Sequence, residues 1–157
     1  MQITFIKQKD KKNTISCKRK DGSATWMASD LFYVQHDLMH FAVETKLGYK
    51  TAFYGMLAGG IDITDFELPK AQRNFEYTEQ AWHAESIVNL LFIQLKQGEN
   101  SDFQTALNAA YIMNAYPFSA PVVSAIAATE IKNLFQKLWL QWNELAYGEA
   151  LHLLFEE

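Results

Sequence analysis

The stretch from His36 to Gly48 constrains the fold more than any other part of this 157-residue chain. Its six apolar side chains would occupy most of the circumference of an α-helix outside its polar residues; they are Leu38, Met39, Phe41, Ala42, Val43 and Leu47. A helix with so wide an apolar surface is packed on more than one side. The stretch therefore predicts a central helix that other segments surround, with Gly48 as its left-handed end.

A narrow polar stripe interrupts this apolar surface. Residues four apart on an α-helix lie nearly one above another, since the helix advances about 100° per residue. His36, His40 and Glu44 follow that spacing. Asp37 lies about 100° from His36 on the same side. The four side chains form one stripe that faces either solvent or an internal groove, and the pattern does not decide between them.

The stripe predicts a metal site. Two imidazoles at i and i+4 can bind one ion, as in the zinc helices with a His-Glu-x-x-His motif. His36 and His40 would be ligands, and Glu44 would complete a two-His, one-carboxylate set that suits zinc or non-haem iron. Asp37 stands where those helices carry the general base. It is therefore the candidate catalytic residue, either as a base or as an acid that orients an imidazole.

A second interpretation fits the same residues. The stripe would then be the wet face of an amphipathic helix, with ordinary contacts such as that of His40 with Glu44. On that interpretation the protein is a non-catalytic interaction or dimerisation module. The leading hypothesis is a metal-binding protein, as a metal-dependent hydrolase or another metalloenzyme, and whether the chain is an enzyme stays open. The sequence names neither a substrate nor an oligomeric state, and a homo-oligomer fits it.

The segments around this stretch predict an α+β fold, as one domain over residues 1–157. Residues 1–28 contain β-branched and aromatic runs separated by turn signals, which predicts a small antiparallel meander. Residues 30–146 have helical periodicity, which predicts about four to five helices, and the last of them is expected to open at 119–121. Residues 149–156 alternate after Gly148, so we expect a C-terminal strand that returns to the N-terminal hairpin.

The segments between the helices also bear on the site. Residues 61–76 have no sustained periodicity, so we expect a loop that crosses one face and covers a groove. A helix over 78–97 follows, and its Glu79 and His83 are again four apart. His83 is therefore a candidate fourth ligand, although a His beside an aromatic neighbour also fits partly buried packing. Ser101 and Gln104 have the spacing of a capping box for the next helix.

Composition limits the location and the partners. The chain is 49% hydrophobic, and its only cysteine, Cys17, excludes an intramolecular disulfide framework. It has neither the apolar core of a signal peptide nor a run that could span a bilayer, so we expect a cytoplasmic, bacterial-type protein without a membrane partner. Residues 1–20 hold seven Lys or Arg and one acid. Without a nucleic-acid motif, DNA or RNA is not the expected partner of these residues.

Several motifs together resemble a family of small uncharacterised bacterial proteins. They are Asp21-Gly22-Ser23-x-Thr25-Trp26, then His36-Asp37-Leu38-x-His40-Phe41-x-Val43-Glu44, then Leu47-Gly48 and Phe53-x-Gly55. A Trp-rich last helix followed by Gly and a short apolar tail is also similar. Members of that family tend to have Pro before the first His, where this chain has Gln35. The resemblance implies no established activity.

A shorter likeness concerns the helical zinc-binding proteins of ubiquinone biosynthesis, whose ligands include His-Asp-x-x-His. His36, Asp37 and His40 match those positions. That family also requires a Glu well downstream, whereas Glu44 comes too early here and the next Glu is Glu67. The likeness therefore implies a metal at the motif and does not extend to quinone chemistry.

Overall fold

The computed structural model describes residues 1–98 and 102–157. Within these ranges it confirms the predicted α+β class, with helices and one antiparallel sheet. The strands are β1 (Gln2–Ile6), β2 (Asn13–Lys18), β3 (Ala24–Ser29) and β4 (Ala150–Leu154). The α-helices are α1 (Leu31–Leu47), α2 (Phe53–Ala58), α3 (Glu79–Gln97), α4 (Phe103–Met113) and α5 (Ala125–Glu144). Two short 3-10 helices, η1 (Ile63–Glu67) and η2 (Lys70–Gln72), lie between α2 and α3.

The sheet joins the two ends of the sequence. Its strand order is β3-β2-β1-β4, and every neighbouring pair is antiparallel. The expected C-terminal strand is β4, and it pairs with β1 so that Phe5 lies opposite Leu151. Side chains alternate between the two faces of a strand, so Ile3, Phe5 and Ile15 all point into the core and are fully buried. The sheet therefore packs one face against the helices.

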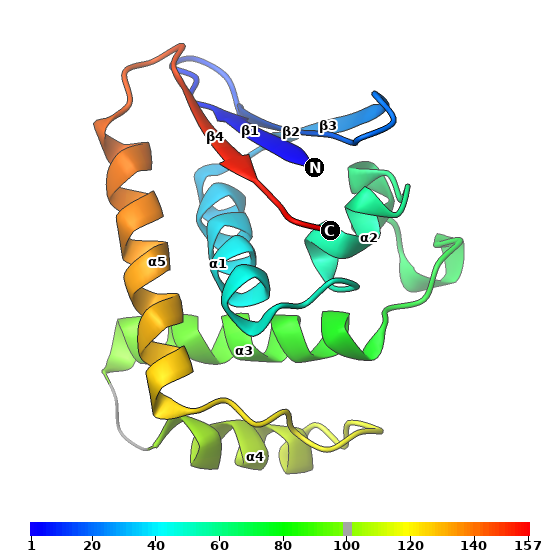
Figure 1. Cartoon of the computed structure of the whole chain (residues 1–157), viewed down its shortest axis with the longest axis vertical. Coiled ribbons are helices and arrows are strands. Elements are labelled where there is room, and N and C mark those ends of the chain that lie inside the picture. Colours follow the sequence, from blue (N-terminus) through cyan, green and yellow to red (C-terminus); the bar gives the residue numbers. More distant parts are fainter. Residues whose placement is uncertain (99–101) are drawn as a thin grey trace.

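The helices form layers beneath that face (Figure 1). Helix α1 lies under the sheet and packs most extensively against α5, while α3 crosses beneath both and α4 lies below α3. The prediction of a central helix is confirmed, since Leu38, Met39 and Val43 of α1 are fully buried. Its end is also confirmed, because Gly48 has a φ of 66° and its N–H bonds the carbonyl of Glu44.

Side-chain caps set the starts of the later helices. Helix α5 begins at Ala125 and not at the predicted 119–121, because Ser124 is the residue that accepts a hydrogen bond from the N–H of Ala127. The preceding segment is held instead by Gln104 of α4, which bonds the carbonyl of Pro121 and the N–H of Val123. The predicted cap Ser101 lies outside the described residues, and Asp102 accepts the capping bond of α4.

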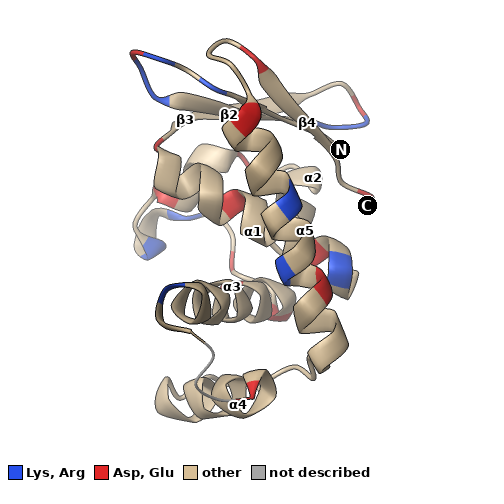
Figure 2. Ribbon diagram, turned by 90° about the vertical axis from the view of Figure 1, so that its left-hand side faces the viewer, with Lys and Arg blue, Asp and Glu red and all other residues tan. Residues whose placement is uncertain are grey.

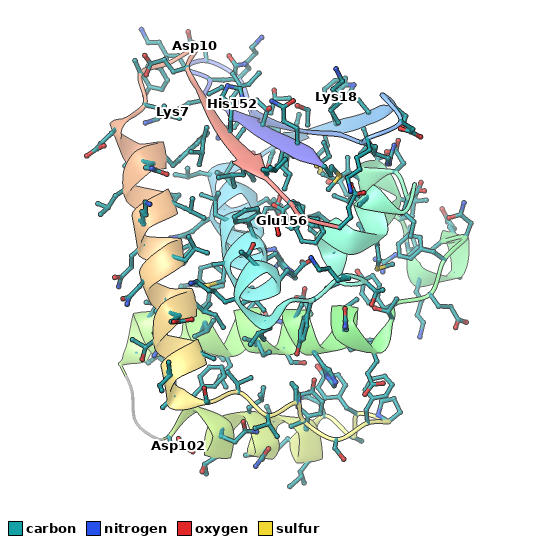
Figure 3. The ribbon with its side chains drawn as sticks, in the orientation of Figure 1. Lys7, Asp10, Lys18, Asp102, His152 and Glu156 are labelled. Atoms are coloured by element: carbon teal, nitrogen blue, oxygen red, sulfur yellow. The ribbon has the colours of Figure 1, made fainter. Side chains whose placement is uncertain are left out.

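The basic residues of the N-terminal segment do not form one patch. Figure 2 shows Lys and Arg in turns at the two ends of the sheet. Lys7 has a structural role, since its Nζ donates to the carbonyls of Trp142, Asn143 and Leu145 at the end of α5 (Figure 3). A cation there complements the negative end of the helix dipole. No helix within the described ranges is both long and apolar enough to cross a bilayer.

Candidate metal centre

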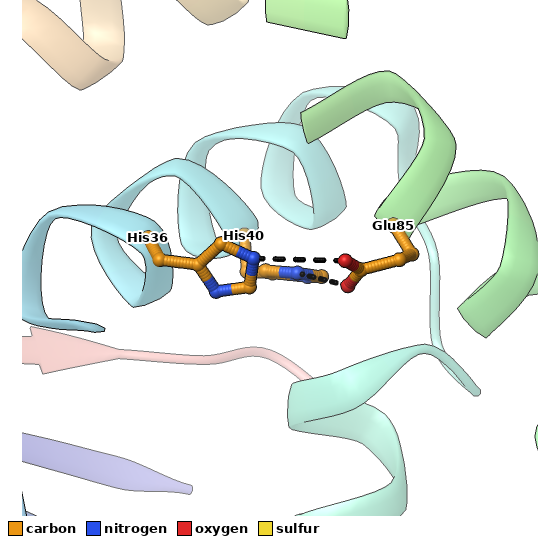
Figure 4. Close-up of side chains that lie close together, drawn as sticks. All are labelled: His36, His40 and Glu85. Carbon is orange, nitrogen blue, oxygen red and sulfur yellow. Dashed lines mark hydrogen bonds and ion pairs between the residues drawn. The ribbon is translucent and has the colours of Figure 1, made fainter. Parts of the chain in front are cut away.

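The crossing of α1 and α3 brings two histidines and one carboxylate together (Figure 4). His36 and His40 stand one turn apart on α1, and Glu85 reaches them from α3. The Nε2 atom of His40 lies 3.1 Å from Oε2 of Glu85, and Nε2 of His36 lies 3.8 Å from Oε1. One ligand atom from each residue lies within 4.8 Å of the other two. The predicted pairing of His36 with His40 therefore exists in three dimensions.

These distances are close to those of a metal site. Zinc binds nitrogen and carboxylate oxygen at about 2.0–2.2 Å, so two atoms bound to one ion lie no more than about 4 Å apart. The longest separation here, 4.8 Å, exceeds that limit by less than an ångström.

Sequence reasoning did not identify Glu85 as a candidate ligand. The sequence does contain a clue to this role. Glu85 lies on the same face of α3 as the apolar residues Ala81, Val88 and Phe92, and that face packs toward α1. A carboxylate among apolar neighbours needs partners. Besides the two imidazoles, Glu85 accepts a hydrogen bond from Nδ2 of Asn89 at 3.0 Å, one turn further along α3.

The predicted ligand Glu44 lies on the opposite side of His40. Its Oε1 is 3.4 Å from Nδ1 of His40, and its Oε2 accepts a hydrogen bond from the N–H of Tyr54 at the start of α2. A carboxylate is favourable there because the first N–H groups of a helix lack helical partners. Gly55 lets the start of α2 lie against the backbone of Lys50, since a Cβ at that position would overlap the carbonyl of Lys50. The structure therefore does not bring Glu44 into the group of three.

Asp37 lies beside the other imidazole. Its Oδ1 is 3.5 Å from Nδ1 of His36, and the side chain lines the cavity next to the site. Each imidazole thus has a carboxylate near Nδ1 and Glu85 near Nε2. Metal-binding histidines commonly have this arrangement, in which an acid near one ring nitrogen fixes the orientation of the ring and directs the other nitrogen at the ion.

The candidate fourth ligand, His83, faces away from the group. Its Nδ1 lies 2.6 Å from the hydroxyl of Tyr111 on α4, and its Nε2 lies 3.3 Å from Glu79. Because the residue packs against aromatic rings, burial lowers its pKa. The remaining histidine, His152, is exposed on β4 and lies 3.1 Å from the hydroxyl of Thr4 (Figure 3).

The pKa values of His40, Glu85 and the neighbouring Glu44 depend strongly on one another. Burial alone would lower the pKa of His40, but Glu44 and Glu85 outweigh it and raise the pKa to about 9. Burial would raise the pKa of Glu85, yet the two imidazoles hold it well below its usual value. Burial raises the pKa of Glu44. The facing atoms of His40 and Glu44 lie close enough for an ion pair but lack a well-aligned hydrogen bond. We infer that one proton is shared within this buried pair.

Comparison with known proteins adds no relative. No protein-family model, no curated protein and no solved structure matches the chain. The resemblances drawn from the motifs therefore stay predictions.

Proposed function

We propose that His36, His40 and Glu85 bind one divalent metal ion, zinc or non-haem iron, and that the protein is a metalloenzyme. One observation carries the proposal: ligand atoms from two separate helices converge to within 4.8 Å beside a cavity. Two His and one carboxylate leave coordination positions free for water and substrate. Such a site suits catalysis better than a purely structural role, which usually has four protein ligands.

The surrounding carboxylates support this assignment. Glu44 and Asp37 lie near the Nδ1 atoms of His40 and His36, where they can orient both rings toward Glu85. Nδ1 of His40 and Oε1 of Glu44 are buried 3.4 Å apart without a well-aligned hydrogen bond. A metal ion at Nε2 would require that nitrogen to be unprotonated, so the remaining ring proton would sit on Nδ1, where it can be donated to Glu44.

A hydrolytic reaction is the form of catalysis that these residues fit best. Zinc in an open site lowers the pKa of bound water and so supplies a nucleophile near neutral pH. Asp37 lines the same cavity, so it is placed to accept a proton there as well as to orient His36. Replacing Asp37 with Asn should therefore leave most of the metal bound and reduce turnover.

Metal analysis of untagged protein tests the proposal. We expect a stoichiometric ion that is lost in the double variant His36→Ala/His40→Ala and kept in His152→Ala, which removes an exposed histidine from the outer face of the sheet. Added zinc should raise the melting temperature, since a ligand at a hundred times its dissociation constant stabilises a fold by about 2.7 kcal/mol. Protein that resists loading and melts unchanged with zinc would refute the site and leave the interaction module as the better hypothesis.

A further inference from the structure

A cavity of about 250 Å³ adjoins the three proposed ligands. Residues from β3, α2, η1, α3 and the segment before α3 form much of its apolar wall. These residues are Met27 of β3, Phe53 of α2, Ile63 and Phe66 of η1, Tyr77, and Ala81 of α3. The segment 61–76, expected to cover a groove, thus supplies part of the wall. An apolar cavity of about 150 Å³ is enough to hold benzene, so this one has room for a single substituted ring.

Apart from the two histidines, the charged side chains that line the cavity are all acids. Among the described residues that line it, none is Lys or Arg, while Asp37, Glu67 and Glu85 are acids. Asp37, Glu44 and Glu85 each have a carboxylate oxygen within 3.5 Å of one of the two imidazoles, so the acids surround the histidines as well. An anion entering the cavity would meet carboxylates and no free cation, and burying it without a counter-charge is costly.

Two cationic side chains close to the cavity, Arg73 and Lys12, already have other partners. Arg73 lies behind the aromatic wall, where its guanidinium donates to the carbonyls of Phe66 and Leu68 and packs over the ring of Tyr77. Lys12 pairs with Asp30 at 3.0 Å. His36 and His40 also line the cavity, and carboxylates lie beside both rings. Asp37 and Glu85 lie beside His36, and Glu44 and Glu85 lie beside His40.

We infer that this cavity takes a small uncharged organic molecule with a largely apolar body, and that it rejects carboxylates and phosphates of the same shape. The inference names the substrate class of the proposed metal centre and so rests on that proposal for its catalytic meaning. The preference for uncharged molecules over anions comes from the apolar lining of the cavity and from the acids around it. We therefore expect the same preference in the metal-free protein.

A matched pair of probes tests the selection. Benzamide and benzoate have nearly the same shape and differ in charge, and each can be titrated into the metal-free protein while backbone amide NMR signals are followed. We expect saturable benzamide binding that is at least about tenfold tighter than benzoate binding, because repulsion between like charges in a partly buried site exceeds that in water. The metal-free protein is used because a carboxylate could coordinate zinc directly.

A cavity-filling variant locates the binding. In Ala81→Leu the added isopropyl group enters the cavity, so benzamide binding should fall by at least about tenfold while zinc binding stays close to that of the unmodified protein. The matched control is Ala109→Leu, the same change at an exposed position of α4, and it should leave both unchanged. Benzoate binding as tightly as benzamide, benzamide binding untouched by Ala81→Leu, or no saturable benzamide binding would each overturn the inference.

The two proposals can fail separately. Suppose that the protein never binds zinc but prefers benzamide to benzoate, and that Ala81→Leu abolishes this binding. That result supports the cavity inference and refutes the metal centre. Protein that binds zinc through His36 and His40 but takes benzoate as readily as benzamide refutes the cavity inference alone.

Discussion

His40 and His83 have the same local pattern and different surroundings. Each is buried on a long helix, and each has a glutamate one turn away, Glu44 for His40 and Glu79 for His83. By spacing alone they are equivalent candidates for a metal ligand.

The facing helix separates them. Nε2 of His40 meets the carboxylate of Glu85, and the two flanking acids raise the pKa of His40 to about 9. Nδ1 of His83 meets the hydroxyl of Tyr111, and burial lowers the pKa of His83. The spacing along one helix thus places a glutamate beside each histidine. The residue on the facing helix then distinguishes a histidine that can become a ligand from one that remains a packed side chain.

The largest expected effect comes from the residue that distinguishes the two sites. Glu85→Gln removes a charged ligand, so zinc affinity, measured by competition with a chelator, should fall by at least about 100-fold, beyond the usual effect of losing an outer carboxylate. Glu79→Gln, the equivalent change beside His83, should leave the affinity unchanged. Equal affinities in the two variants would show that the facing helix does not create the difference.

A smaller effect is expected from Glu44, which orients His40 from the other side. Glu44→Gln keeps an oxygen that can accept the hydrogen bond from Tyr54, so the fold should survive while zinc affinity falls by about 10- to 100-fold. The same chelator competition measures it. A loss as large as that of Glu85→Gln would make Glu44 a direct ligand, as the sequence pattern alone had it, and an unchanged affinity would make it purely structural.

The smallest effect is the dependence of stability on pH in the metal-free protein. The raised pKa of His40 contributes stability that is complete below its unfolded value of 6.5 and is lost as pH rises through about 9. The lowered pKa of His83 has the opposite sign, with stability present above 6.5 and lost as pH falls.

Urea unfolding between about pH 5 and pH 10 separates the two contributions. His40→Gln should remove part of the loss at alkaline pH, and His83→Gln part of the loss at acid pH. His36, whose pKa is also raised by its carboxylate partners against the effect of burial, adds to the alkaline loss in both variants. Identical pH profiles in the two variants would contradict the assigned surroundings.

The sequence predicted the helices and strands better than it predicted how they pack against one another. The strands of the meander, the alternation of Leu151 and Leu153 in β4, and Gly48 at the end of α1 are local signals that the structure keeps. The start of α5 was predicted too early, because the side chain of Gln104 holds residues 121–123 away from a helix. That interaction links segments that no local pattern connects.

The candidate site has the same limit. Helical spacing placed His36 and His40 together, since both stand on one helix. It could not choose between Glu44 and Glu85, because that choice depends on how α3 crosses α1. A carboxylate on the apolar stripe of α3 was the available signal, and it gains meaning only once the facing helix is known.

The pairing of β1 with β4 has a consequence for biosynthesis. Thr4 and His152 lie side by side in the sheet but are 148 positions apart in the chain. While the ribosome is still making the helices, β1 has only β2 as a neighbour, and its other edge stays open to nascent chains and chaperones. Pairing of β4 with β1 is a long-range closure, and contacts so distant in sequence slow folding. The four-stranded sheet can be complete only after β4 has been translated.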